Sequence, residues 1–369
     1  MTQLQTQPNN RLLSLDFLRG LTMVLLTLES TLIIEHLHAA VDGSWTAHIL
    51  GQFEHHPWHG LHFWDLVQPV FMFVAGTALT FSMKKRRQQM TWMQSFVKIL
   101  KRCFWLFFWG VLDYAVRKEG LSFELWDVLT QLSFTTLVAF LIMDFPIIVQ
   151  IIVSFLCLLI PELLYRYSHI PGFDQPFTDQ HNFGNYVDLL LMHKVNNGGW
   201  VAINCISTSA HTIWGVLAGK ILLSSKTSSE KMKYLLVSSG ILLLLGFGLD
   251  WTGITPIIKR IATSAFVLAS GGYCILFLAI CYWWIDIKKH QRHLLFFTIF
   301  GMNSIFIYLF FEIVGDHWFT GYILFINRGL FGFVNFPHVP TEIIGSLVVF
   351  ALEAGIMYFL YRKKIFFKI

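Results

Sequence analysis

Ile261 to Trp284 reads IATSAFVLASGGYCILFLAICYWW and contains no Asp, Glu, Lys, Arg or His. A helix needs about 20 mostly apolar residues to cross a bilayer, so this stretch alone predicts a membrane-spanning helix. The whole chain has the same character, because 55% of its 369 residues are hydrophobic and only 13% are charged. Soluble domains carry about 25% charged residues, and disordered chains are far less apolar. The composition therefore predicts an all-α polytopic membrane protein.

Further apolar stretches on both sides predict about ten transmembrane helices. We expect them near 13–36, 60–83, 97–116, 124–143, 146–165, 200–223, 234–251, 263–285, 294–315 and 343–361. If the N-terminus is cytoplasmic, 20 of the 27 Lys and Arg residues fall on the cytoplasmic side, as the positive-inside rule requires. This predicts both termini in the cytoplasm and a single transmembrane domain over 1–369.

The remaining composition excludes several classes. The net charge of +5 collects in an inner collar that anionic lipid headgroups explain, so no nucleic-acid partner is expected. The five Cys lie in apolar runs without metal-ligand spacing. The first ten residues lack a charged n-region, so we expect no cleavable signal peptide. We expect long outer loops near 37–59, 166–199 and 316–342, which suggests recognition of an extracytoplasmic molecule.

Ionisable residues inside predicted spans mark candidate functional sites, because they are costly there. Asp16 and Arg19 lie three residues apart and are as readily explained as an ion pair at the inner interface. Glu29 and Asp65 lie deeper and have no close partner in sequence, which favours a function. The further cases are Asp113, Glu312 and Glu353.

A histidine cluster runs into the second span. Residues 54–65 read EHHPWHGLHFWD, and Pro57 predicts a helix start there. His62 and Asp65 are then three apart on one helix face. Three interpretations stay open from spacing alone: a metal site, a general base oriented by a carboxylate, and an interfacial belt of amphipathic rings. No recognised metal-ligand motif accompanies the cluster.

Four motifs carry a resemblance to a known family. They are 11–20 (RLLSLDFLRG), 55–69 with His55, Trp58, Gly60, Asp65 and Pro69, 301–312 with Asn303, Ser304, Tyr308 and Glu312, and 360–369 (LYRKKIFFKI). A weaker one is 218–222 (AGKIL). Together they resemble the heparan-alpha-glucosaminide N-acetyltransferase family, in its bacterial transmembrane branch.

The resemblance implies an acetyltransferase. Acetyl-CoA would come from the cytoplasm, and the amine of a glucosamine-type sugar would accept the acetyl group outside. It implies His55 as the catalytic residue with Asp65 beside it, acting by direct transfer, which we favour, or through an acetyl-His intermediate. Along a continuous helix His55 and Asp65 would be about 15 Å apart, so His62 is the alternative partner of Asp65.

Polar and basic residues along the chain are further candidates for contacts with the two substrates of this reaction. For acetyl-CoA we expect contacts from Arg19, Asn303, Ser304, Lys363 and Lys364. For the acceptor we expect contacts from Glu29, His56, Trp58, His62 and Glu312. We expect no metal, a homodimer and a multi-pass location in the bacterial inner membrane. Departures from the family pattern at Ser30, His56 and Thr130-Gln131 leave the acceptor's identity open. The alternatives are a proton-coupled transporter of sugars or cell-wall fragments, and a metal-dependent hydrolase.

Overall fold

The computed structural model describes residues 12–41, 43, 45–116 and 121–367. Arg11, Lys368 and Ile369, which belong to two of the resembling motifs, lie outside these residues. All regular elements in the described part are helical. The longer helices are α1 (Leu13–Ser30), α4 (Val67–Arg86), α5 (Trp92–Ala115), α6 (Val128–Ile142), α7 (Ile147–Tyr167), α9 (Asn204–Leu223), α10 (Ser228–Trp251), α11 (Ser264–Cys281), α14 (Thr320–Gly332) and α15 (His338–Arg362).

Shorter helices complete the chain between these. They are α2 (Ile33–Ala40), α3 (Trp45–Gly51), the 3₁₀ turn η1 (Phe63–Leu66), α8 (Phe183–Met192), η2 (Tyr282–Ile287), α12 (Leu294–Met302), α13 (Ser304–Leu309) and η3 (Phe310–Phe319). Two of these, η2 directly after α11 and η3 directly before α14, are π-helical, with wider turns than an α-helix. Such turns within α-helices often occur at functional sites.

Six of the described helices are long and apolar enough to cross a membrane, and α1 with α2 makes a seventh if this pair, bent by 62°, counts as one span. Helices also lie at the other predicted positions, but their composition or length makes them less suited to crossing a membrane. The α5 helix carries Lys98, Lys101 and Arg102, and α6 has only 15 residues. The chain is thus a helical, multi-pass membrane protein.

The centre of the molecule is built from α4, α9 and α11, whose residues are largely buried. Small residues let α4 and α9 approach closely, since a methyl group at Gly76 would overlap the carbonyl oxygen of Thr212. A methyl at Gly215 would likewise overlap the carbonyl oxygen of Phe73. The Thr77 hydroxyl donates across this contact to the carbonyl oxygen of Gly215 at 3.1 Å. Close packing of small residues with polar cross-links is typical of helix pairs in membranes.

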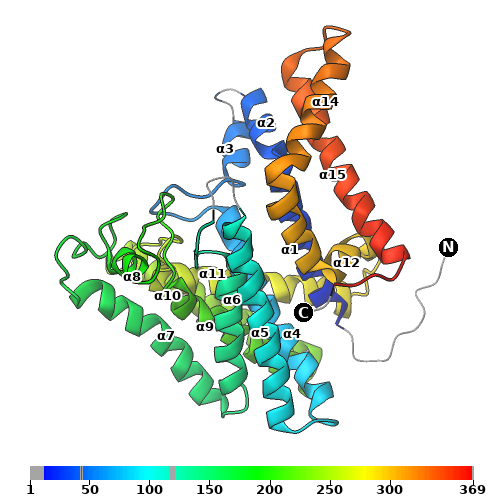
Figure 1. Ribbon diagram of the computed structural model, residues 1–369. Helices are drawn as coiled ribbons and strands as arrows, with labels where there is room; N and C mark the ends of the chain where they lie inside the picture. Colours follow the sequence, from blue (N-terminus) through cyan, green and yellow to red (C-terminus); the bar gives the residue numbers. More distant parts are fainter. Residues whose placement is uncertain (1–11, 42, 44, 117–120, 368–369) are drawn as a thin grey trace.

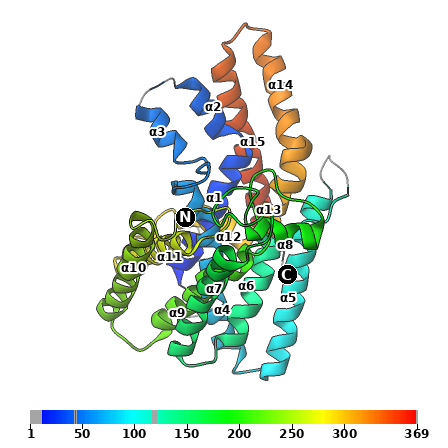
Figure 2. The same cartoon turned by 90° about the vertical axis from the view of Figure 1, so that its left-hand side faces the viewer.

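Outer helices surround this centre. In Figure 1, α7 and α10 lie to one side, and α14 and α15 form a hairpin that rises beside α2. Figure 2, turned by 90°, shows the same hairpin projecting beyond the other helices. A short turn joins α6 to α7, and α7 starts directly after Pro146. Arg87 and Asp144 pair between the α4–α5 and α6–α7 connections, so these two turns lie at the same end.

Two expectations about local structure are wrong. Residues 316–332 continue a helix through η3 and α14 instead of forming an outer loop. Pro57 does not start a helix, because helical structure begins at Phe63. The cause is Gly60, whose φ of +148° is unfavourable for other residues. Its N–H donates to the carbonyl oxygen of Ile257 at 2.9 Å, so the chain runs across the helix end before it turns.

Candidate active site

The segment 52–62 crosses the N-terminal end of η1 and α4 and is tied to other loops at this end. The Trp58 indole donates to the carbonyl oxygen of Phe177 at 2.8 Å. His59 Nε2 lies 2.7 Å from Asp250 Oδ1, and His59 also pairs with Ile258 in a single antiparallel bridge. These ties fold the chain back, so residues ten positions apart meet over the helix end.

Asp65 is the centre of this arrangement and is fully buried. Its Oδ1 lies 3.0 Å from His55 Nδ1. Its Oδ2 accepts from the backbone N–H of His62 at 2.9 Å and of His56 at 3.3 Å. The position in the first helical turn also suits a carboxylate, because the helix dipole is positive there. His55 therefore meets Asp65 by its side chain, and His62 meets it by its backbone.

A third charged residue joins this pair. Lys259 comes from the loop between α10 and α11 and is only 6% exposed. Its Nζ lies 3.0 Å from His55 Nδ1 and 3.6 Å from Asp65 Oδ1. Burial, followed by the Lys259 ammonium, lowers the pKa of His55 to about 4. Burial lowers the pKa of Lys259 to about 8, although the Asp65 carboxylate opposes this.

Below this trio lies a cavity of about 260 Å³, which we call the polar cavity. Its walls come from α1, η1, α4, α13, η3, the C-terminal end of α5, the N-terminal end of α6 and the neighbouring loops. Apolar and aromatic side chains lie between the polar ones. The polar lining residues are Glu29, His55, Gln68, Tyr114, Asp127, Lys259, Tyr308 and Glu312.

Hydrogen bonds fix several of these walls. Glu29 Oε1 accepts from the Trp64 indole at 2.8 Å. The Tyr308 hydroxyl donates to Asp127 Oδ2 at 2.6 Å. Gln68 Nε2 donates to Gln131 Oε1 at 2.9 Å. Side chains held by such contacts are preorganised, as a binding site requires.

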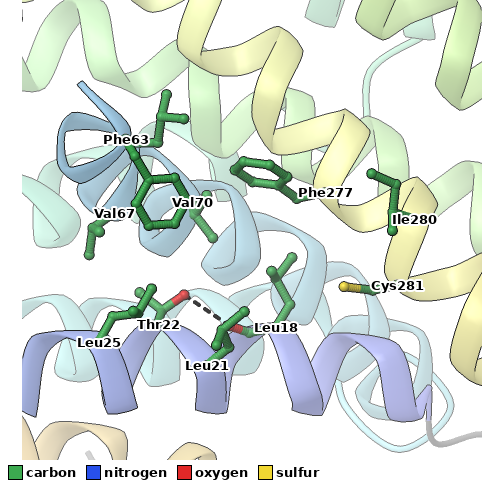
Figure 3. A pocket seen from close by; sticks show the side chains of 11 residues that line it. Leu18, Leu21, Thr22, Leu25, Phe63, Val67, Val70, Phe277, Ile280 and Cys281 are labelled. Carbon is green, nitrogen blue, oxygen red and sulfur yellow. Dashed lines mark hydrogen bonds between the residues drawn. The ribbon is translucent and has the colours of Figure 1, made fainter. Parts of the chain in front are cut away.

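A second, contrasting pocket adjoins the polar cavity and shares Val67 with it. This apolar groove has a volume of about 130 Å³ and runs between α1, α4 and α11. Figure 3 shows its lining, including Leu18, Leu21, Leu25, Val67, Val70 and Phe277. The one hydroxyl among them, that of Thr22, is turned back onto the carbonyl oxygen of Leu18 at 2.9 Å. Val67 lines both the groove and the polar cavity.

Residues 11–214 match the model of one protein family, DUF5009, described as a domain of unknown function. The chain belongs to this family. A search of curated proteins finds no match. The DUF5009 match covers α1 to the middle of α9, and so includes His55, Asp65 and Glu29 but not Lys259 or Tyr308.

The structure gathers some of the predicted site residues of this DUF5009 protein at the polar cavity. Glu29, His55 and Glu312 line it directly, and Asp65 reaches it through His55. The other three predicted acceptor residues lie in the crossing segment. His56 and His62 stack edge to face at 4.7 Å, and His62 Nδ1 lies 3.0 Å from the carbonyl oxygen of Glu54. None of His56, Trp58 and His62 is among the lining residues of the cavity.

The predicted acetyl-CoA residues lie away from the polar cavity. Asn303 is buried and holds the end of the described chain. Its Nδ2 donates to the carbonyl oxygen of Ile365 at 2.9 Å, and its Oδ1 accepts from Phe367 N at 2.8 Å. Ser304 starts α13, and Lys363 and Lys364 are exposed after α15. Arg19 is partly buried in α1.

Sequence reasoning missed several lining residues of the polar cavity, among them Gln68, Tyr114, Asp127, Trp200 and Lys259. The signal for Lys259 was local, because it stands between Ile258 and Ile261, which are both 1% exposed. A lysine between buried apolar residues is itself buried and must find a counter-charge. Within the described residues, no three His, Cys, Asp or Glu side chains form a group that could hold a metal ion.

Proposed function

We propose that this protein is a membrane-embedded acetyltransferase. It moves the acetyl group of cytoplasmic acetyl-CoA to the amine of a glucosamine-type sugar on the other side of the membrane. The observation that carries the proposal is the His55–Asp65 contact of 3.0 Å at the polar cavity. A His whose second nitrogen is held by a buried carboxylate is the usual arrangement of a general base.

The polar cavity suits a small amine. Its volume of about 260 Å³ is slightly below the range of about 300–1,000 Å³ that is usual for small-molecule sites. Carboxyl groups of Glu29, Asp127 and Glu312 line it against a single ammonium, that of Lys259. This charge balance favours a cationic or neutral amine over an anionic, sulfated sugar.

In the proposed reaction, His55 acts on the acceptor amine directly. Asp65 accepts a hydrogen bond from Nδ1–H, which leaves the lone pair on Nε2. Nε2 takes the proton that the amine loses as its nitrogen bonds to the acetyl carbon. The carbon–sulfur bond then breaks, and the proton passes to the sulfur of CoA. Direct transfer needs one ternary complex, whereas an acetyl-His intermediate would give ping-pong kinetics.

The membrane arrangement belongs to the same proposal. We propose ten spans with both termini in the cytoplasm, in the bacterial inner membrane, and a homodimer. The shared end of the α4–α5 and α6–α7 turns supports this alternation of directions. On this topology Arg19, Lys363 and Lys364 lie on the cytoplasmic side, where they would bind the phosphates of acetyl-CoA. Asn303 and Ser304 would face its pantetheine arm once the segment 365–367 moves aside.

The test supplies acetyl-CoA and glucosamine to the purified full-length protein in nanodiscs. We expect N-acetylglucosamine to form, and we expect His55→Ala to abolish it. His59→Ala is the matched control, because His59 pairs with Asp250 in the same segment but is 58% exposed. Unchanged transfer by His55→Ala would remove His55 from the mechanism.

The transporter alternative makes a different prediction. The carboxyl groups of Glu29, Asp127 and Glu312 along one cavity are what a proton-coupled transporter would use. Proteoliposomes that accumulate glucosamine without acetylating it, and with no need for acetyl-CoA, would support that alternative and overturn the acetyltransferase.

A further inference from the structure

Lys259 is the least expected group in the site. An ammonium that is 6% exposed has lost most of its hydration. It is held by the loop between α10 and α11, whose backbone is fixed to the crossing segment through Gly60 and Ile257. The Trp200 ring lies 5.2 Å from Nζ and favours a cation at this position.

The groups around Lys259 are of both signs. Asp65 on η1 and Glu29 on α1 favour its charged form, whereas Arg260, its neighbour in the loop, opposes it. Arg260 itself donates to the carbonyl oxygen of Gly198 and lies 5.9 Å from the Trp200 ring. The remaining titratable groups that face Lys259 across the polar cavity are Tyr114, Asp127, Tyr308 and Glu312.

The geometry at His55 Nδ1 decides what Lys259 does. Asp65 Oδ1 and Lys259 Nζ both lie 3.0 Å from this one nitrogen. An ammonium donates to Nδ1 only if Nδ1 has no proton, and the imidazole proton is then on Nε2. When Lys259 is a neutral amine, it does not require Nδ1 to be unprotonated. Nδ1 then keeps its proton, and Nε2 has the lone pair. The protonation of Lys259 thus selects the tautomer of His55.

Resting on the proposed function, we propose that Lys259 is a positioning residue that holds the proton behind His55. When the acceptor amine gives its proton to Nε2, the Nδ1 proton passes to the neutral Nζ of Lys259, and Asp65 stabilises the ammonium that forms. When the carbon–sulfur bond breaks, Nε2–H protonates the CoA sulfur, and Nδ1 recovers its proton from Lys259. The products are the amide and CoA thiol, and every group returns to its starting state.

This relay explains why the imidazole is never required to become a cation. Because the pKa of His55 is about 4, its imidazolium form is unfavourable near neutral pH. The pKa of Lys259, about 8, is much closer to the operating pH, where a proton acceptor works best. The base of the site is then Lys259, acting through His55.

The test is the pH profile of kcat/KM for glucosamine acetylation by the full-length protein in nanodiscs, from pH 6 to 9.5. For the wild type we expect a rise toward a plateau above about pH 8. We expect Lys259→Arg to lose at least about 100-fold and to lose this rise, because a guanidinium keeps its charge but cannot be deprotonated. Arg260→Lys is the neighbouring control and should keep the wild-type profile. A Lys259→Arg enzyme with wild-type activity and profile would overturn the relay.

Two further measurements keep the inference testable if Lys259→Arg does not fold. Lys259→Cys alkylated with 2-bromoethylamine restores an amine that is more acidic than lysine, so the rise should move to lower pH, with identically treated wild type as the control. An increase of kcat/KM that occurs at the same pH as in the wild type would contradict the proposal. Nitrogen-15 NMR of the His55 ring needs no acetyl transfer. The ring should change from Nε2–H to Nδ1–H as the pH passes about 8 in the wild type and show no such change in Lys259→Met.

The two kinds of failure are separate. If the wild type acetylates nothing but its His55 tautomer changes with Lys259, the proposed function is wrong and the coupling of the two residues stands. If acetylation occurs without any tautomer change, the function stands and the relay is wrong.

Discussion

The polar cavity and the apolar groove lie next to each other at one helix end, where they share Val67 as a lining residue, and they are built in opposite ways. Asp65 and Phe63 belong to one 3₁₀ turn, yet the first holds the polar trio and the second lines the groove. In the cavity, carboxyl and hydroxyl groups are held by partners on other elements, such as Tyr308 on Asp127. In the groove, the only hydroxyl is turned back onto its own helix. The difference teaches that polar and apolar pockets can adjoin at one helix end when partners on other elements hold the polar groups of one of them.

The largest effect is expected from Asp65→Asn. An amide in place of the carboxylate behind a catalytic His costs about 10⁴-fold in kcat in the serine protease triad, and here it also leaves the buried Lys259 ammonium without its nearest counter-charge. We expect a loss of about 10³–10⁴-fold in acetyl transfer, measured by product formation. Asp250→Asn is the matched control, because Asp250 also pairs with a His of the crossing segment, His59, but this His is 58% exposed and lies outside the polar cavity. Equal losses in both variants would contradict a special role for the cavity pair.

A smaller effect is expected from Glu29→Gln. The amide oxygen can still accept from the Trp64 indole, so folding should be kept, but one negative charge of the cavity is lost. Because a charge-assisted hydrogen bond contributes about 1.5–3 kcal/mol, we expect KM for the amine to rise about 10-fold or more with kcat nearly unchanged. Glu162→Gln, outside the cavity, is the control. An unchanged KM would show that Glu29 does not face the acceptor.

A change in the groove should separate stability from activity. Leu18 is 3% exposed and lines only the groove. Leu18→Ala should lower the free energy of unfolding by about 3 kcal/mol and change kcat/KM by less than about twofold at a temperature where the variant is folded. Thermal unfolding and kinetics measured on one preparation check this. A large kinetic defect would mean that the groove and the cavity act as one site.

The smallest effect concerns pH and stability. The pKa of His55 in the folded protein is about 4, below the ordinary 6.5. Between these values the unfolded imidazole binds the proton first, so the folded state loses stability as the pH falls from 6.5 toward 4. His55→Asn should lack this contribution and therefore lose less stability than the wild type over the same interval. Urea unfolding at pH 7 and pH 4.5 compares them, and parallel losses would contradict the pKa shift.

The sequence revealed those site residues that are costly to bury in an apolar span or that belong to a known family motif. Glu29 and Glu312 stood out because carboxyl groups in apolar spans need a reason, and both line the cavity. The pairing of His55 with Asp65 came from a family resemblance, because helix spacing favoured His62. The spacing argument failed since it assumed a helix from Pro57, whereas the positive φ of Gly60 lets the chain cross the helix end.

The rest of the site was beyond the reach of local patterns. Lys259 and His55 are 204 positions apart, and Tyr308 and Asp127 are 181 apart. Such contacts depend on how whole helices pack, and no periodicity or motif in either segment encodes them. The helical class followed from composition alone, but the predicted loop at 316–342 did not, because the helix continues through η3 into α14.

Val67 has one more consequence, because its side chain is the partition between the two pockets. Its isopropyl group is apolar, and beyond it lies the apolar groove, whose low permittivity cannot screen the carboxyl groups of the cavity. Their field is therefore concentrated in the cavity, as happens in clefts with low-dielectric walls. A valine with no chemistry of its own would thus shape the potential that the proposed amine acceptor meets in the polar cavity.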